Sequence, residues 1–193
     1  TLFRSICFGT LAQRSPVTRK TLRSLVEATG PNCMRVFDVN LRAPYWTPQA
    51  LVWGCSHATV LKMNHEEAPQ LAQALDASMP EQTLLQTAHF FLQRFPIKLV
   101  AITRGEKGSL LVTRQETCDH PGVAVKVVDP IGAGDAFTAA LTHYLLRHSP
   151  LPMVAEAANR WGAWVATQRG GMPRADELAR VKWKLDIKTA ISV

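Results

Sequence analysis

The sequence predicts an α/β fold, because short apolar runs alternate along the chain with segments of helical periodicity. Most of these runs are continuously apolar, which is typical of parallel strands that are covered on both faces. The 193 residues fit one domain with a sizeable core, and no internal repeat or linker interrupts them. Ligands of such sheets bind beyond the carboxyl ends of the strands, so the loops there are the first candidates for function.

Each element follows from its residue pattern. The first helix, over 16–28, has Ser15 as N-cap, Pro16 at its first position and Gly30 beyond its end. The predicted strands cover residues 5–9, 34–39, 58–62, 99–103, 109–113 and 123–128. The predicted helices cover residues 16–28, 48–54, 66–75, 81–94, 133–146 and 153–167, and a weaker helix and then a strand follow from Ala175.

Composition indicates a globular protein, with 47% hydrophobic and 19% charged residues. No apolar run approaches the roughly 20 residues that a membrane-spanning helix needs, so no membrane partner is expected. The four cysteines form no C-x-x-C pair, which favours reduced core thiols in a cytoplasmic protein. The chain opens on Thr1 without a visible signal peptide, so we expect a processed chain or a fragment.

The net charge of +7 is concentrated toward the two ends of the chain. Residues 1–50 hold seven Lys/Arg against two Asp/Glu, which could attract a nucleotide or a nucleic acid. The alternative is a solvated helix face, because Arg19, Lys20 and Arg23 lie at helical spacing. A basic nucleic-acid-binding domain would interleave aromatic residues with its cations, and the five tryptophans do not interleave with the basic run at 14–23. No nucleic-acid partner is therefore expected.

The strongest functional segment is the turn D-P-I-G-A-G-D at 129–135, which follows a predicted strand and opens a predicted helix. The small residues Gly132, Ala133 and Gly134 let backbone N–H groups approach a ligand. A helix N-terminus adds unpaired donors and a positive dipole end, so the turn suits a phosphate. Asp135 would lie beside that phosphate, where it could take a hydroxyl proton. The alternative is a tight turn in which Asp135 only caps the helix.

This string, with the small residues Ala139 and Ala140 after it, resembles the second signature of the ribokinase-like (PfkB) family of carbohydrate kinases. The resemblance implies a three-layer fold with a mainly parallel sheet and transfer of the ATP γ-phosphoryl to a sugar hydroxyl. Asp135 would be the general base, while Gly132, Ala133 and Gly134 would stabilise developing charge.

The resemblance spans nearly all of the chain but only the later part of the family's chain. The family's first strands, its glycine-rich first signature and its lid have no counterpart. We therefore expect residues 1–193 to form a single partial domain that carries the nucleotide-binding and catalytic part. Alone, it is expected to be inactive.

Asn64-His65-Glu66-Glu67 resembles the family's N-x-x-E motif. The resemblance implies that Glu67 acts on Mg²⁺ through water, which suits an ion that keeps several waters. The alternative is structural, with Asn64 capping a helix and Glu67 as its capping-box partner.

The segment 103–108 resembles the family's T-x-G-x-x-G turn, which holds the nucleotide; the alternative is a hairpin turn that uses glycine for positive φ. Asn159 falls where the family often has an adenine-side contact. The residues that the resemblance implies for ATP binding are Asn64, Thr103, Gly105, Lys107, Gly108, Gly134 and Asn159.

The segment F-D-V-N-L-R at 37–42 resembles the strand end of fructokinases and 2-keto-3-deoxygluconate kinases. Asn40 and Arg42, together with Asp135, would contact the sugar or the transferred phosphoryl, because the arginine fork pairs with phosphate oxygens. The alternative is an Arg42 that pairs with Asp38. Fructose or a similar hexose is the first expected substrate, with 2-keto-3-deoxygluconate or a nucleoside as alternatives.

The resemblance also implies a potassium site and a homodimer of the full-length protein. The potassium residues rest on position alone, and they are Asp129, Ile131, Ala166 and Gly171. The expected cofactors are thus ATP, Mg²⁺ and K⁺.

Overall fold

The computed structural model describes residues 3–76, 82–174 and 176. These residues form two compact units, the first made of the described parts of 1–105 and 109–119, the second of 106–108 and the described residues from 120 onward. Each unit is treated by itself below, and the expectation of a single domain stays a prediction.

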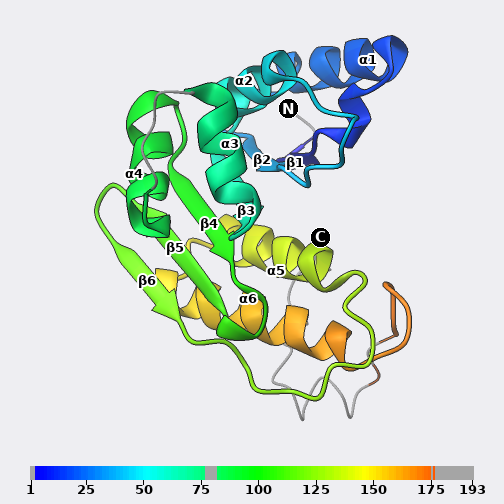
Figure 1. The fold of residues 1–193 in the computed structure, drawn as a ribbon, viewed down its shortest axis with the longest axis vertical. Helices are drawn as coiled ribbons and strands as arrows, with labels where there is room; N and C mark the ends of the chain where they lie inside the picture. The colour runs from blue at the N-terminus through cyan, green and yellow to red at the C-terminus, as the bar shows by residue number, and fades with distance from the viewer. Residues whose placement is uncertain (1–2, 77–81, 175, 177–193) are drawn as a thin grey trace. The chain divides into compact units, whose positions relative to one another are not determined.

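The first unit is built on a six-stranded sheet whose strands lie in sequence order (Figure 1). The strands are β1 Ser5–Phe8, β2 Met34–Asp38, β3 Val60–Asn64, β4 Leu99–Thr103, β5 Ser109–Thr113 and β6 Thr117–His120. Neighbours from β1 to β4 pair in parallel, and β5 runs antiparallel to β4. The predicted α/β fold is thereby confirmed.

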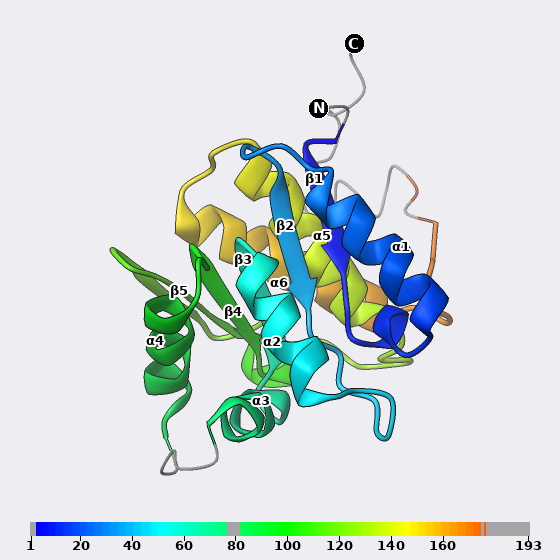
Figure 2. The ribbon, with the colours of Figure 1, turned by 90° about the horizontal axis from the view of Figure 1, so that it is seen from above.

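One face of this sheet is covered by helices (Figure 2). They are α1 Pro16–Glu27, α2 Pro48–His57, α3 Glu67–Leu75 and α4 Leu84–Arg94. Two short 3-10 helices lie at Leu11–Gln13 and Gly105–Lys107. The register aligns one apolar residue from each of β1 to β5 in a row that belongs to the buried core: Phe8, Phe37, Leu61, Val100 and Val112. Complete burial of such a side chain stabilises a fold by about 1.5–3 kcal/mol, so this row contributes to holding sheet and helices together.

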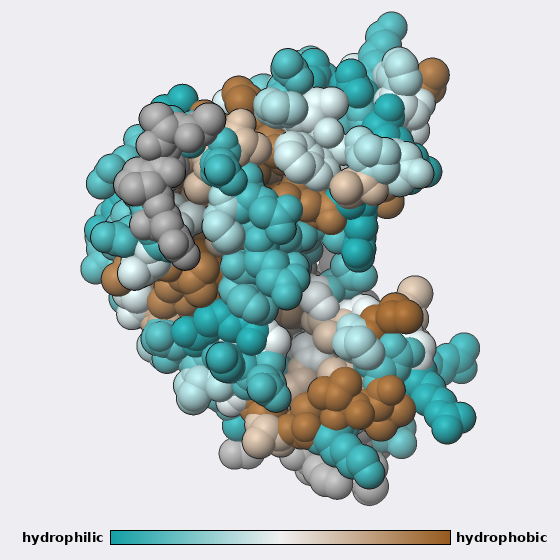
Figure 3. Space-filling model, in the orientation of Figure 1, coloured by the Kyte–Doolittle hydropathy of each residue, from teal (hydrophilic) through white to brown (hydrophobic). Residues whose placement is uncertain are grey.

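The second unit is a helical hairpin of α5 Ala133–Leu146 and α6 Leu151–Ala166 (Figure 1). Gly162 lets the helices approach, since a Cβ there would lie 3.1 Å from the Ala133 carbonyl oxygen. Hydrophobic atoms gather on the surface of this unit near the end of α6 (Figure 3). Among its exposed apolar residues are Val127, Val128, Ile131, Met153 and Met172.

The predicted strand over 123–128 is wrong, because residues 121–127 have no regular structure. Pro121 and Gly122 precede it and Pro130 follows it, and the N–H groups of Val128 and Asp129 both donate to the Ala166 carbonyl oxygen rather than to a strand. The sheet instead gains β6, whose sequence T-C-D-H carries too little apolar character to have been predicted.

Other boundaries moved for local reasons. The third strand lies at 60–64 rather than 58–62, because α2 continues to His57 and the Ala58 N–H still donates to Gly54. Helix α4 begins at Leu84 rather than at 81, because Thr83 and Gln86 form a capping box. The elements predicted from Ala175 fall almost wholly outside the described residues.

Burial separates the cysteines by reactivity. Cys55 is buried in the core of the first unit, and this burial raises the pKa of its thiol to about 12, whereas Cys7 is exposed. The thiolate is the nucleophile, so in folded protein at pH 8 we expect iodoacetamide to alkylate Cys7 well before Cys55, and both at similar rates in urea. Peptide mass spectrometry over time measures both rates. Equal rates in the folded protein would contradict a closed core.

Candidate active site

The turn before α5 is held by one carboxylate in the second unit. Asp129 Oδ1 accepts the N–H of Ile131 at 3.0 Å, and Oδ2 accepts the N–H of Gly170 at 3.0 Å. The two bonds, that of Ile131 first, lower the pKa of the Asp129 carboxyl below its usual value. The ionised side chain therefore joins the turn at 129–132 to the segment that follows α6.

Gly132 is the N-cap of α5, with φ +81° and ψ −8°. This left-handed conformation favours glycine, and a Cβ there would lie 2.4 Å from the Gly171 carbonyl oxygen. The Ala133 N–H donates to Pro130 at 3.2 Å, but the N–H groups of Gly134 and Asp135 have no acceptor among the described residues. The helix therefore opens with two unpaired donors, as an anion site requires.

Asp135 lies in the first turn of α5 and is exposed. Within the described part of the chain its carboxylate has no hydrogen bond or ion pair. The alternative interpretation, in which Asp135 caps the helix, finds no support, because Gly132 is the N-cap and no side chain caps this helix. No contact that the structure describes therefore occupies the Asp135 carboxylate.

The residues predicted for potassium come together around the same turn. Ile131 packs near Gly171, and Asp129 reaches Gly170. The Ala166 carbonyl oxygen, however, accepts the N–H groups of Val128 at 2.8 Å and Asp129 at 3.1 Å. Both of its lone pairs are used, so Ala166 fits a cation poorly in this structure.

In the first unit, the N-x-x-E and T-x-G-x-x-G segments begin at neighbouring strand ends. Asn64 and Thr103 are register partners of β3 and β4, and the His65 N–H donates to the Thr103 carbonyl oxygen at 2.8 Å. Gly105 has φ +62°, as the turn requires. Two predicted nucleotide residues, Asn64 and Thr103, are thereby brought to one edge of the sheet.

Gly105 also belongs to the first unit, whereas Lys107, Gly108, Gly134 and Asn159 lie in the second unit. Lys107 is exposed, and Gly108 has φ +76° with no room for a side chain, since a Cβ would lie 2.0 Å from the His120 carbonyl oxygen. Asn159 is buried in α6, and its amide donates to the Ala155 carbonyl oxygen of its own helix at 2.8 Å.

Asn64 and Glu67 form a reciprocal cap at the start of α3. Asn64 Oδ1 accepts the N–H of Glu67 at 2.8 Å, and Glu67 Oε2 accepts the N–H of Asn64 at 2.8 Å. The structural alternative predicted for these residues is thus observed. Glu67 also does something that no capping box requires, because its Oε1 accepts the N–H of Leu41 at 2.8 Å.

Leu41 lies between Asn40 and Arg42, the two residues predicted to contact the sugar, which follow β2. Asn40 has φ +42°, and its carbonyl oxygen accepts the Thr10 hydroxyl at 3.0 Å. Arg42 is exposed and makes no ion pair among the described residues, so the alternative in which it pairs with Asp38 is wrong. That carboxylate pairs instead with Lys62.

Sequence reasoning missed Lys62, whose Nζ lies 3.0 Å from Asp38 Oδ1. The two residues are register partners on β2 and β3. A usable signal was present, since a lysine inside an apolar strand demands a nearby carboxylate.

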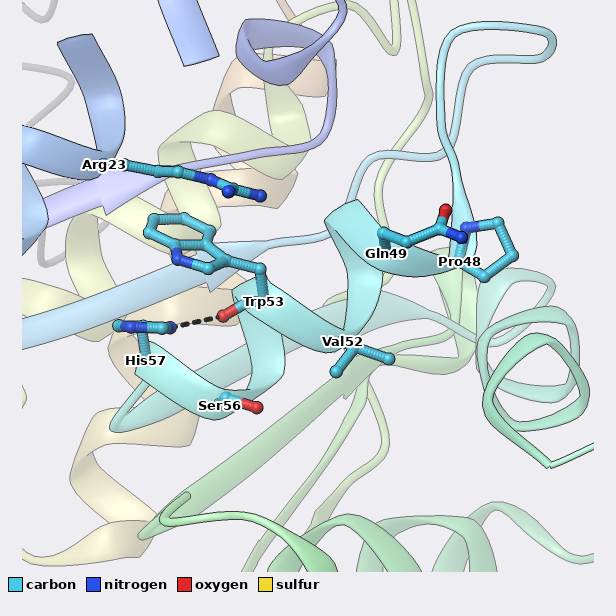
Figure 4. Close-up of a pocket in the computed structure, with 7 residues that line it drawn as sticks. All are labelled: Arg23, Pro48, Gln49, Val52, Trp53, Ser56 and His57. Atoms are coloured by element: carbon cyan, nitrogen blue, oxygen red, sulfur yellow. Dashed lines mark hydrogen bonds between the residues drawn. The ribbon is translucent and has the colours of Figure 1, made fainter. Parts of the chain in front are cut away.

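A separate pocket of about 500 Å³ opens in the first unit beside α1 and α2 (Figure 4). Arg23 lies over the indole of Trp53 at 5.1 Å, and the His57 ring stacks on that indole at 4.5 Å between ring centroids. The pocket contains none of the predicted site residues. Its lining residues are Arg23, Pro48, Gln49, Val52, Trp53, Ser56 and His57.

Comparison with known proteins identifies the family of this chain. Residues 9–177 match the pfkB family carbohydrate kinase model. A fructokinase of Vibrio alginolyticus is 32% identical over 189 residues, which are 91% of this chain and 59% of that protein. This chain therefore belongs to the pfkB family of carbohydrate kinases.

Two solved structures share its fold. One is aminoimidazole riboside kinase from Salmonella enterica in complex with aminoimidazole riboside and an ATP analogue, with a TM-score of 0.74 and 25% identity over 95% of this chain and 63% of that one. The other is a fructokinase double mutant from Vibrio cholerae O395 bound to fructose, ADP and potassium, with a TM-score of 0.73 and 27% identity over 88% and 56%. The chain thus spans a little over half the length of these relatives.

None of the helices that the structure describes has the length and apolar character that a membrane crossing requires. Within the same residues, no group of three or more His, Cys, Asp or Glu side chains could hold a metal ion by itself.

The two bonds of Asp129 predict a pH dependence. A carboxyl whose pKa is lower in the folded state stabilises the fold above its unfolded pKa of about 3.9, and this contribution is lost as pH falls through the folded pKa. We therefore expect Asp129→Asn to lower the urea midpoint at pH 7, and the gap from the parent to shrink as pH falls below about 4.

Glu106→Gln is the matched control, since Glu106 is exposed and its side chain has no partner among the described residues. Urea midpoints at several pH values measure the effect. A gap for Asp129→Asn that is the same at pH 7 and pH 3 would refute the charge-dependent account.

Proposed function

We propose that the intact protein transfers the γ-phosphoryl group of ATP to a hydroxyl of a small sugar, with fructose or a similar hexose as the first candidate. The observation that carries the proposal is the start of α5. There, Gly132 has a left-handed conformation, and among the described residues the N–H groups of Gly134 and Asp135 and the Asp135 carboxylate have no partner. Membership of a carbohydrate kinase family supports it.

In the proposed reaction, the sugar hydroxyl oxygen forms a bond to the γ-phosphorus as the bond from that phosphorus to the β–γ bridging oxygen breaks. ADP leaves, and Asp135 takes the hydroxyl proton. A carboxylate is a weak base for an alcohol, so it accepts the proton late, when the new bond is largely formed. The N–H donors of the turn stabilise the negative charge on the phosphoryl oxygens.

For magnesium, we propose that Glu67 of the first unit holds a water of the ion. Each carboxylate oxygen of Glu67 accepts one backbone N–H and keeps one lone pair, which is enough to hold a water of the ion. Magnesium needs only one or two carboxylates besides the phosphates, so three clustered ligands are not required. When bound, the ion would neutralise charge between the phosphates.

For potassium, we propose the Asp129 carboxylate and the carbonyl oxygens of Ile131 and Gly171. Ala166 is left out because its oxygen is already satisfied by two N–H groups. A cation here would reinforce the turn that presents the donors of α5.

Substrate identity rests on Asn40 and Arg42, the sugar-side residues of this chain. The relatives include fructokinases and an aminoimidazole riboside kinase, so a riboside is the second candidate substrate. The phosphorylation rates of fructose, 2-keto-3-deoxygluconate, adenosine and aminoimidazole riboside would separate these possibilities. We further propose a cytoplasmic enzyme that acts on small molecules, as a homodimer, rather than on nucleic acid.

Asp135→Asn tests the proposed base in the intact protein. The expected result is a fall in kcat of about 10²–10⁴-fold with little change in ATP affinity, because the amide cannot take the proton but keeps the size of the side chain. Initial-rate kinetics and calorimetry with ATP measure the two quantities. A kcat within a few-fold of the parent would remove Asp135 from the proton transfer.

A further inference from the structure

Glu67 connects two loops with one carboxylate. Its Oε2 accepts the N–H of Asn64, the last residue of β3. Its Oε1 accepts the N–H of Leu41, which lies beyond the end of β2. Both bonds are 2.8 Å long, and Glu67 is only 7% exposed. Hydrogen bonds to a buried charged acceptor are among the stronger ones in proteins, so these two contacts hold both loops firmly.

The loop that Glu67 holds is one that does not keep its shape unaided. Asn40 has φ +42°, a region that non-glycine residues seldom occupy and that surrounding contacts must maintain. Two contacts flank it, since Thr10 donates its hydroxyl to the Asn40 carbonyl oxygen at 3.0 Å and Glu67 accepts the next N–H. Thr10 is 1% exposed, so the loop is held from both sides by buried groups.

Helix capping explains only half of this arrangement. A capping box needs the Asn64 N–H and one oxygen at Glu67, and a glutamine serves there as well as a glutamate. The second oxygen, aimed at Leu41, contributes nothing to the cap. Its role must therefore be sought in the loop that it contacts, where Asn40 and Arg42 flank Leu41.

We propose that Glu67 is a positioning residue for the sugar. Through the Leu41 N–H it sets the backbone that presents Asn40 and Arg42, and it does so whether or not nucleotide and magnesium are bound. This inference rests on the proposed function, because it takes these two residues as the sugar-side contacts.

Glu67→Gln separates the positioning role from the metal role. Glutamine keeps one carbonyl oxygen for the Asn64 cap but presents an NH₂ group to the Leu41 N–H, where donor meets donor. Glu66→Gln is the matched control, because it removes the same charge at the adjacent position. Glu66 is exposed, and its side chain has no bond among the described residues.

Sugar affinity is measured by calorimetry on the intact protein without nucleotide or magnesium, using fructose, 2-keto-3-deoxygluconate, adenosine and aminoimidazole riboside as probes. Glu67→Gln should weaken binding of the sugar that the parent binds by about 10-fold or more, as expected for loss of a hydrogen bond to a charged group. Glu66→Gln should bind like the parent. An unchanged affinity in Glu67→Gln would overturn the proposal and leave Glu67 with its cap and metal roles.

Hydrogen exchange of the peptide that contains residues 39–43 tests the contact without any ligand. Exchange should be faster in Glu67→Gln than in the parent and in Glu66→Gln, and equal exchange would overturn the proposal. If the parent binds none of the four probes, the proposed function and the sugar-positioning role fail together, whereas probe binding by the parent with equal exchange overturns the positioning role alone.

Thr10→Val tests the same loop by a second contact, in case Glu67→Gln does not fold. It removes the hydroxyl bond to Asn40 from the other side of the loop and leaves Glu67 untouched. Thr10→Val should weaken binding of the same sugar, while the magnesium concentration for half-maximal rate stays at the parent value. A normal sugar affinity in Thr10→Val would contradict a loop that depends on these flanking contacts.

Discussion

The parallel register of β2, β3 and β4 is the constraint on which the candidate site residues of the first unit depend. Parallel strands end at one edge of a sheet, and the pairing of Asp38 with Lys62 and of Asn64 with Thr103 aligns those ends residue by residue. The loop that carries Asn40 and Arg42, the N-x-x-E turn and the T-x-G-x-x-G turn therefore begin at the same edge of the sheet. A slip by one residue would turn every side chain of a strand to the other face and would separate these groups.

In the second unit, the candidate site is positioned by backbone conformation and hydrogen bonds rather than by strand register. Its donors are amides at the start of α5, and their direction is set by Gly132 and by the two bonds of Asp129. Amides held in this way lose little entropy when they meet an anion, which is the advantage of preorganised donors in phosphoryl transfer. Asp135, the proposed base, takes no part in these bonds among the described residues.

Much of this could be predicted from local sequence, and the failures have physical causes. The turn at 129–135 and the strands at 99–103 and 109–113 were predictable because glycine spacing and apolar runs act locally. The Asp38–Lys62 pair and the Leu41–Glu67 bond were not, because each joins residues 24 or 26 positions apart whose meeting depends on strand register. The prediction of a strand at 123–128 was wrong for a related reason. Its apolar residues resemble a strand, but the N–H groups of Val128 and Asp129 donate to the carbonyl oxygen of Ala166 at the end of α6.

The Lys62–Asp38 pair has a consequence for how homologous sequences can diverge. Removing one partner of a buried ion pair leaves an uncompensated charge and costs about 3–5 kcal/mol, whereas replacing both by apolar residues of similar volume is often neutral. The two positions should therefore covary among relatives, as a charged pair in some lineages and an apolar pair in others. A lone lysine or a lone aspartate at this point of the sheet would mark a lineage that has found another partner for it.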